Sequence, residues 1–311
     1  MITTASADTR RQTTLKRRRG ASSRRWRDAA VFVPFVFPNL LLVLVFCWWP
    51  ILQNIQLSTL NWTLGNRKAT VVGAANYVEF FTEDAGPILR TTVIFTVVTV
   101  GGSMLIGLLL ALVLNRGLRG TTFARATTFA PFVLSGVGVG LVWTFIFDPN
   151  IGISSQILRE LSLAVPQWFL DPNLSLAMIC IVFIWKNLGY CAVIYLAGLQ
   201  SIPRDLMEAA SIDGASPLRR FWSVTLPLLS PTTFFLVLTT VLSSLQSFDL
   251  IRIMTPLGNG TTTLMYAVYL QAFGGYNRGG YSAALATVLF VILALVTFIQ
   301  MRLMQKRVHY S

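Results

Sequence analysis

Six stretches of about 20 to 24 mostly apolar residues recur along the chain, and shorter polar segments separate them. Each stretch is long enough to cross a hydrocarbon layer about 30 Å thick as a helix. The pattern therefore predicts an all-α, polytopic membrane bundle of six transmembrane helices. They are placed near residues 29–50, 91–115, 127–147, 174–198, 232–254 and 281–302. Pro34, Pro38 and Pro50 fall in the first stretch and predict kinks there.

Composition supports this assignment over a soluble protein. Of the 311 residues, 54% are hydrophobic and only 12% are charged, which is too much apolar surface for a soluble domain of this size to bury. The net charge of +13 is otherwise typical of nucleic-acid binders, but the apolar stretches point to the lipid bilayer as the partner. No nucleic-acid partner is expected.

The distribution of basic residues predicts the orientation. With the N-terminus inside, 18 of the 25 Lys and Arg residues fall in cytoplasmic segments, six fall outside, and Lys186 lies within a span. This bias follows the positive-inside rule and places both termini in the cytoplasm. Residues 1–28 are predicted to form a basic, disordered cytoplasmic tail, and residues 29–311 the transmembrane domain.

The sequence offers no residues for catalysis or for a metal site. Cys47, Cys180 and Cys191 lie in apolar stretches, and the single histidine, His309, is near the C-terminus. No nucleotide-binding G-x-x-x-x-G-K-[ST] occurs, so any ATP and its Mg²⁺ must be bound by another chain. We therefore expect a chain that is not an enzyme and binds no cofactor or metal itself.

The polar segment 201–227, between the fourth and fifth stretches, is predicted to be folded. Ser201 is a predicted N-cap, with Pro203 near the first helical position, and Gly214 stands where a helix would end in the left-handed conformation. Ser216 and Pro217 repeat the cap and proline for a second helix. Two short helices joined at a glycine make a knob that fits a groove on another protein, or a capped loop that lies on the membrane surface; physics alone leaves both open.

This segment resembles a known motif. EAASIDGASPLRRFWSVTLPL, residues 208–228, is similar to the EAA loop of permease subunits of ATP-binding-cassette (ABC) importers, and the resemblance extends upstream through YLAGLQSIPRDLMEAA. The resemblance implies that the loop docks into a cleft of a separate ATPase. Its implied interface residues are Glu208, Ala209, Ala210, Asp213, Gly214, Arg219, Phe221 and Pro227.

The rest of the chain is similar to the maltose-type carbohydrate permeases. GAANYVEFF, GLLLALVLNRG, SFDLIRIMT and GGYSAALATVLF carry this resemblance. TTTLMYAVYLQAF and the terminal KRVHYS look most like the first permease subunit of sn-glycerol-3-phosphate and glycerophosphodiester importers. The family implies the type I importer fold in a bacterial cell (inner or plasma) membrane. It also implies four partners: a second homologous permease, two ATPase subunits and an extracytoplasmic binding protein.

Polar residues inside the spans are candidates for a substrate path. Lys186 lies mid-span, where an ammonium needs a partner or a water-filled cavity. The candidate set is Lys186, Asn187, Tyr190, Gln246, Phe248, Asp249 and Arg252. A cationic path for an anionic substrate is one interpretation; the other is that Lys186 or Arg252 simply pairs with Asp249.

Trp143, Trp185, Tyr190 and Phe248 offer stacking surface for a sugar or polyol, or serve only in packing. Gly136 and Gly140 form a G-x-x-x-G that predicts a close helix crossing.

The sequence therefore favours an ABC importer permease for glycerol phosphate or a glycerophosphodiester. A disaccharide or oligosaccharide substrate remains an alternative, as does, in another class, a secondary transporter or channel.

Overall fold

The computed structural model describes residue 34 and residues 36–66, 68–116 and 120–307. The predicted basic tail, residues 1–28, lies outside the described residues. The chain divides into two compact units, residues 1–56 and 57–311, which are described separately below.

The first unit holds the first membrane span. Its helix contains a π-helical turn, η1 (Leu44–Trp48), and continues into α2 (Trp49–Ser58), so that the apolar helix covers Val36–Ser58 rather than the predicted 29–50. The helix runs through Pro38 and Pro50. The helix ends eight residues beyond the predicted end at residue 50, and the predicted start at residue 29 lies outside the described residues.

The three π-helical turns among the described residues each lie just before a proline. They are η1, η2 (Phe80–Asp84) and η3 (Phe221–Thr225), which precede Pro50, Pro87 and Pro227. A proline lacks the N–H that would bond the carbonyl four residues earlier, and its ring clashes with that carbonyl. A widened turn relieves this clash, so the helices continue through these prolines.

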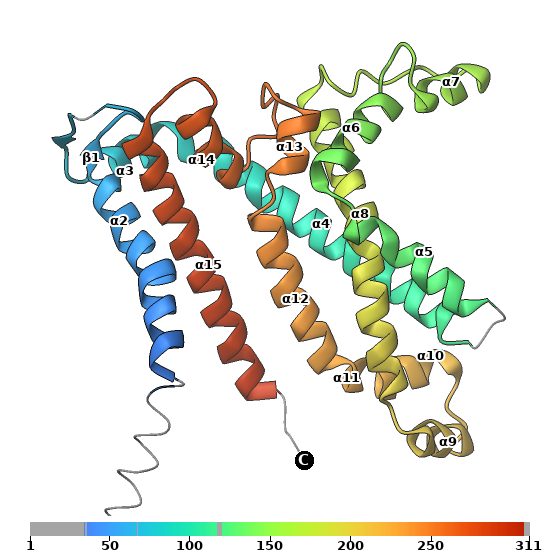
Figure 1. Cartoon of the computed structure of the whole chain (residues 1–311). Coiled ribbons are helices and arrows are strands. Elements are labelled where there is room, and N and C mark those ends of the chain that lie inside the picture. The colour runs from blue at the N-terminus through green and yellow to red at the C-terminus, as the bar shows by residue number, and fades with distance from the viewer. Residues whose placement is uncertain (1–33, 35, 67, 117–119, 308–311) are drawn as a thin grey trace, which may run out of the picture. The chain divides into compact units, whose positions relative to one another are not determined.

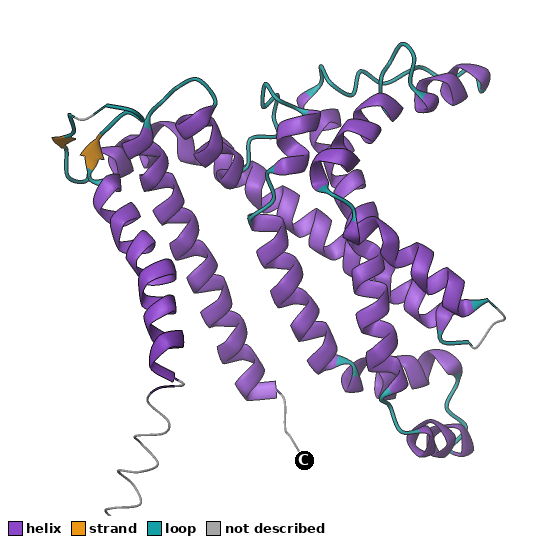
Figure 2. Cartoon of the chain, in the orientation of Figure 1, coloured by secondary structure: helices purple, strands orange, loops and turns teal. Residues whose placement is uncertain are grey.

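The second unit is built on two long, closely packed helices. α3 (Ala75–Glu79), η2 and α4 (Ala85–Leu114) form one apolar helical run of 40 residues, much longer than the predicted 91–115. α8 (Pro172–Gln200) packs along α4 and agrees with the predicted 174–198. α15 (Gly279–Arg307) is the last span, predicted at 281–302 (Figures 1 and 2).

The third span is broken, which corrects the single helix predicted for 127–147. α5 (Thr121–Val133) and α6 (Gly136–Ile146) meet at an angle of 98°. Leu134 and Ser135 leave the helical region, with ψ of 146° and 133°. The break therefore falls in the middle of an apolar stretch, where hydropathy gives no signal.

The fifth span is also divided, into α12 (Ser230–Leu245) and α13 (Asp249–Met254), where 232–254 was predicted as one helix. Two further helices were not predicted: α7 (Ile153–Glu160), which is amphipathic, and α14 (Leu264–Phe273), which is apolar but short. Both lie at the end of the second unit that carries the β-hairpin (Figure 1). We call this the outer end, because the basic-residue bias predicts that it faces away from the cytoplasm.

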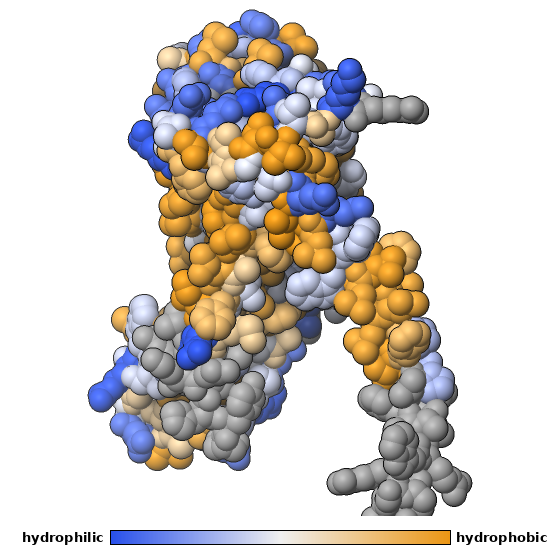
Figure 3. All heavy atoms as spheres, turned by 90° about the vertical axis from the view of Figure 1, so that its left-hand side faces the viewer, coloured by the Kyte–Doolittle hydropathy of each residue, from blue (hydrophilic) through white to orange (hydrophobic). Residues whose placement is uncertain are grey.

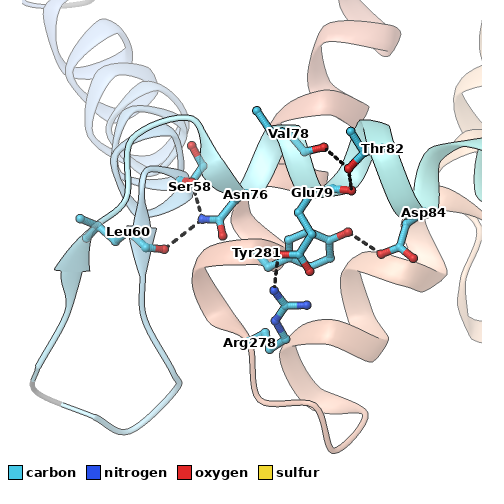
Figure 4. Close-up of polar contacts among 9 residues, drawn as sticks. All are labelled: Ser58, Leu60, Asn76, Val78, Glu79, Thr82, Asp84, Arg278 and Tyr281. Carbon is cyan, nitrogen blue, oxygen red and sulfur yellow. Dashed lines mark hydrogen bonds and ion pairs between the residues drawn. The ribbon is translucent and has the colours of Figure 1, made fainter.

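A small polar network ties the hairpin to the helices at the outer end (Figure 4). β1 (Leu60–Asn61) pairs antiparallel with β2 (Thr70–Val71). The Asn76 side chain donates to the carbonyls of Ser58 and Leu60, at 2.8 and 3.1 Å, and so holds the chain where it enters the hairpin.

Two acids on η2 and α3 reach the start of α15 (Figure 4). Arg278 forms an ion pair with Glu79 at 2.7 Å, and the Tyr281 hydroxyl donates to Asp84. The nearby carboxylate of Glu79 raises the pKa of Arg278, so this cation stays charged. The network fixes the beginning of the last span against the beginning of α4.

Apolar side chains cover much of the exterior. Val93, Val97 and Leu105 on α4 are 59–65% exposed. On the face of the second unit turned to the viewer in Figure 3, apolar residues form a band between polar ends. This distribution suits a hydrocarbon environment, since a protein in water would bury such side chains.

Candidate functional site

A cavity of about 620 Å³ opens at the break of the third span. Five of the seven predicted substrate-path residues line it: Lys186, Asn187, Gln246, Phe248 and Asp249. Its other lining residues are Phe132, Gly136, Phe183, Ser243, Ser247, Leu250 and Met265. Residues from α5, α6, α8, α12, α13 and α14 thus converge at one place in the bundle.

Lys186 is attached to the broken helix. Its Nζ donates to the carbonyl oxygen of Phe132 at 2.9 Å and lies 5.6 Å from the centroid of the Phe132 ring. In a continuous helix this carbonyl would accept from the amide four residues later, at Gly136. Because the helix stops at Val133, the carbonyl is free and the ammonium satisfies it.

Asp249 lies beside the first residue of α6. A Cβ added to Gly136 would lie 3.2 Å from the Asp249 Cβ and 3.6 Å from Oδ2. Asp249 is also the first residue of α13. The N-terminal ends of helices carry partial positive charge, so the start of α13 and the start of α6 both favour this carboxylate.

Neither cation forms a salt bridge with Asp249. Within the described ranges, the single ion pair with N···O of 4.0 Å or less is Arg278–Glu79. The interpretation in which Lys186 or Arg252 pairs with Asp249 therefore has no support in this structure. An ammonium and a carboxylate therefore share the cavity, and the ammonium bonds a backbone carbonyl rather than the carboxylate.

The remaining two predicted residues do not line the cavity. Tyr190 stacks on Phe132 with ring centroids 4.8 Å apart and donates to the Thr239 hydroxyl at 3.2 Å. The Arg252 guanidinium lies over the Tyr269 ring, 4.7 Å from its centroid. Tyr190 therefore supports the cavity wall at Phe132, and Arg252 lies outside it.

Sequence reasoning missed five lining residues: Phe132, Phe183, Ser247, Leu250 and Met265. Nothing in the local sequence distinguishes Phe132 from the other apolar residues of its stretch, since its exposure to the cavity depends on the break after Val133. Among the aromatic candidates, Phe248 lines the cavity, whereas Trp143 and Trp185 pack edge to face with centroids 5.4 Å apart. The two tryptophans are therefore part of the packing.

The glycines at the start of α6 allow a close helix crossing, as predicted. A Cβ at Gly140 would lie 3.0 Å from side-chain atoms of Ile253 on α13, and Gly136 meets Asp249 on the same helix. α13 therefore packs directly on α6 and carries Asp249 to the broken span.

The segment 201–227 folds as two short helices at the inner end of the second unit, the end opposite the hairpin (Figure 1). α9 (Arg204–Ile212) is followed by α10 (Pro217–Arg220), η3 and α11 (Leu226–Leu228). Gly214 has φ of +76°, and the amide of Ala215 bonds the Ala210 carbonyl at 3.1 Å, which closes α9 as predicted. Ser216 caps α10 by accepting from the Arg219 amide at 3.3 Å.

The predicted N-cap at Ser201 is wrong. Ser201 ends α8, and its hydroxyl donates to the Gly198 carbonyl at 2.8 Å. α9 instead begins after Pro203, without a side-chain cap. α8 extends two residues beyond the predicted end of the span and takes in the segment where the cap was expected.

Most of the predicted interface residues of this segment are exposed. Glu208, Ala209, Asp213, Gly214, Arg219 and Pro227 are exposed, while Ala210 and Phe221 are half-buried. The segment also exposes large apolar side chains that the prediction left out. Ile212 is 86% exposed, Leu218 69% and Trp222 60%. The signal was present in the sequence, since these are apolar residues in an otherwise polar segment.

Comparisons with known proteins agree with this geometry. Residues 103–310 match the family described as "Binding-protein-dependent transport system inner membrane component". The chain is 38% identical over 282 residues to the sn-glycerol-3-phosphate transport system permease protein UgpA of Agrobacterium fabrum (strain C58 / ATCC 33970), covering 89% of this chain and 95% of the relative. It is 37% identical to the protein of the same name from Rhizobium meliloti (strain 1021), with the same coverage.

The fold is similar to that of a chain in the crystal structure of a bacterial alginate ABC transporter in complex with an alginate pentasaccharide-bound periplasmic protein. The TM-score is 0.78 at 19% identity, over 91% of this chain and 96% of that one. Family, relatives and fold therefore confirm an all-α, multi-pass bacterial membrane protein and a permease component, which is not itself catalytic. The chain belongs to the binding-protein-dependent transport system inner membrane components, the permease family of ABC importers.

Proposed function

We propose that this chain is a permease subunit that imports sn-glycerol-3-phosphate or a glycerophosphodiester. The substrate is delivered by an extracytoplasmic binding protein. The chain pairs with a second homologous permease, and two separate ATPase subunits bind ATP and Mg²⁺. The segment 201–227 receives the movement of the ATPases, through Glu208, Ala209, Ala210, Asp213, Gly214, Arg219, Phe221 and Pro227.

One observation carries the choice of an anionic substrate: Lys186 faces a cavity with no carboxylate within 4.0 Å of its ammonium among the described residues. Its hydrogen bond to the Phe132 carbonyl leaves further N–H groups of the ammonium for an incoming oxygen. A phosphate oxygen suits this donor. The names of the two relatives, which specify sn-glycerol-3-phosphate, support the same choice.

The fold suggests how movement reaches the cavity. α4 and α8 form a closely packed pair. In the chain, α9 and α10 connect the inner end of α8 to α12, so a displacement of α9 and α10 acts first on those two helices. The breaks between α5 and α6 and between α12 and α13 both adjoin the cavity. These interruptions are the places where a rigid-body movement of helices opens the cavity to one side or the other.

The substrate assignment is tested by replacing Lys186 in the complete transporter and measuring uptake driven by ATP. We expect Lys186→Gln to lower uptake of glycerol phosphate by about tenfold or more, since a hydrogen bond to a charged group is lost, and Lys186→Arg to retain part of it. Arg90→Gln is the matched control, because Arg90 is exposed and lies outside the cavity. Unchanged uptake in Lys186→Gln would refute the assignment.

A disaccharide or oligosaccharide is the second candidate, and the other polar groups of the cavity favour it. Asn187, Gln246, Ser243 and Ser247 are neutral, and Phe248 offers an apolar face to a sugar ring. Asp249 would repel a phosphate but accept from hydroxyl groups. If Asp249→Asn lowers uptake of a sugar and Lys186→Gln does not, the sugar is the substrate. Transport in vesicles without an ATPase would instead identify a secondary transporter or channel.

A further inference from the structure

A second cavity, of about 600 Å³, lies at the inner end of the second unit. Its walls come from the C-terminal ends of α4 and α8, from α5 and from the segment 201–227. Its lining residues are Leu112, Leu114, Asn115, Arg125, Leu199, Gln200, Ile202, Arg204, Met207 and Thr225. It shares no residue with the cavity at Lys186, so it has no part in the substrate site proposed above.

Two arginines line this cavity without an acidic counterpart. Arg125 comes from α5 and Arg204 is the first residue of α9. No Asp or Glu lines the cavity, and neither guanidinium has a carboxylate within 4.0 Å in the described part of the chain. Residues 117–119, which precede α5 and are not described, contain no acid either.

Arg125 also carries a buried donor without a hydrogen-bond partner. Its Nε is inaccessible to solvent and bonds nothing in the structure. A buried N–H left unpaired costs roughly 1–3 kcal/mol, and more on a charged group, so this guanidinium is incompletely satisfied within the described part of the chain. The neutral groups of Asn115, Gln200 and Thr225 supply further polar contacts around the same space.

We propose that this cavity binds a phosphate-bearing anion held between Arg125 and Arg204. A guanidinium presents paired N–H donors that match two oxygens of a phosphate, and two guanidiniums facing one space without a carboxylate favour an anion of several oxygens. The cavity lies where the apolar helices α4 and α8 end, which is the level of lipid headgroups. The phosphate therefore comes either from an anionic lipid or from a soluble phosphate in the cytoplasm.

The bound anion would join the membrane bundle to the segment 201–227, which the proposed function treats as a moving element. Arg125 belongs to the membrane bundle, whereas Arg204 starts the first helix of the segment 201–227. An anion held by both side chains ties α9 to α5 and stabilises the position of this segment seen here. The ligand thereby acts on the element through which the ATPase is proposed to move the bundle.

The test uses the complete transporter, purified in a maltoside detergent and phosphate-free buffer, with thermal unfolding as the readout. One arm titrates inorganic phosphate against chloride at equal ionic strength. The other adds phosphatidylglycerol or phosphatidylcholine in mixed micelles. We expect the unfolding midpoint to rise with phosphate, phosphatidylglycerol or both; a rise with phosphatidylglycerol alone identifies a headgroup.

The variants separate this site from general charge effects. Arg125→Gln and Arg204→Gln should each weaken the apparent affinity for the active probe by about tenfold or more, because each removes a charged hydrogen bond. Arg116→Gln, an exposed cation near the same end that does not line the cavity, should keep the wild-type response. Arg125→Lys and Arg204→Lys keep the charge and are expected to give intermediate affinity, provided they elute as folded complexes.

Two results would overturn the proposal. One is a wild-type midpoint that neither probe shifts, which would leave the arginines to bind a carboxylate of the ATPase. The other is an equal loss of response in Arg116→Gln, which would show that the effect is one of surface charge. Both results are independent of the uptake measurements on Lys186.

Discussion

The Nζ of Lys186 on α8 lies 2.9 Å from the carbonyl oxygen of Phe132 near the end of α5. This contact joins an unbroken span to the broken one at the point where the break leaves a carbonyl without its helical donor. The same side chain is the one on which the proposed substrate site depends, so it has a structural as well as a binding role.

The structural role predicts a stability effect that needs no substrate. Replacing Lys186 by Met removes the donor and leaves the Phe132 carbonyl unpaired, which should destabilise the purified protein by about 1 kcal/mol. Lys186→Gln keeps a hydrogen-bond donor at this position, so it should destabilise the protein less than Lys186→Met does. Thermal unfolding of both variants without substrate measures this, and equal midpoints for wild type and Lys186→Met would show that the hydrogen bond contributes nothing to stability.

Close packing of α8 on α5 depends on Gly189. A Cβ at this position would lie 1.9 Å from the backbone oxygen of Thr128, which cannot move without displacing α5. Gly189→Ala should therefore destabilise the protein by roughly 1–3 kcal/mol or prevent correct folding. Gly101→Ala is the matched control, because Gly101 also lies within a span and a Cβ there meets nothing within 4 Å. Similar yield and midpoint for the two variants would contradict the packing seen here.

The turn at Gly214 should decide coupling to the ATPase. With φ of +76°, Gly214 adopts a conformation that valine strains strongly and asparagine tolerates. We expect Gly214→Val to abolish ATP-driven uptake and to reduce co-purification of the ATPase, while Gly214→Asn retains most of both. If Gly214→Val transports and co-purifies like wild type, the segment 201–227 does not couple in the proposed way.

The loop after α6 should respond to acid. The Asp148 carboxylate accepts from the amides of Ile151 and Asn150, and these hydrogen bonds lower its pKa from the ordinary value of an aspartate. A lowered pKa means that the contribution of the ionised group is complete at neutral pH and is lost as the pH falls through that lowered value. Hydrogen exchange of the Asn150 and Ile151 amides should therefore accelerate only in strong acid, beyond the change expected from intrinsic rates.

Asp148→Ala supplies the control for this behaviour. Without the acceptor, the two amides should exchange faster already at neutral pH, and the acid-dependent step should disappear. Retention of that step in Asp148→Ala would assign it to another group.

Predictions made from the sequence were good where one local rule governs the structure. In the described part of the chain, a predicted stretch overlaps each of the five long apolar helices and the bent pair, because a span must satisfy its backbone in helical hydrogen bonds whatever its neighbours are. The glycine stop at Gly214 and the cap at Ser216 were also predicted, since both depend only on adjacent backbone. Ser201 was misassigned because a serine with a proline two residues later fits both the end of one helix and the start of the next.

The substrate cavity was predicted only in part. Lys186 and Asp249 stand out because an ionised side chain in an apolar stretch is costly, and Asn187, Gln246 and Phe248 are near them in sequence. Phe132 and Met265 are ordinary residues of α5 and α14, and Ser247 lies in the short link between α12 and α13; the cavity brings the three together. No local feature of the sequence marks them.

The sequence alone therefore determined the membrane class, the approximate spans and the folded segment 201–227, because these follow from apolar length and from contacts between residues near in sequence. Only the tertiary structure decided that the third span breaks after Val133, that Lys186 satisfies the carbonyl exposed there, and that Arg125 and Arg204 face one cavity. The reason is physical: a break in an apolar helix is stable only if side chains from other helices satisfy the freed backbone, and those side chains are distant in sequence.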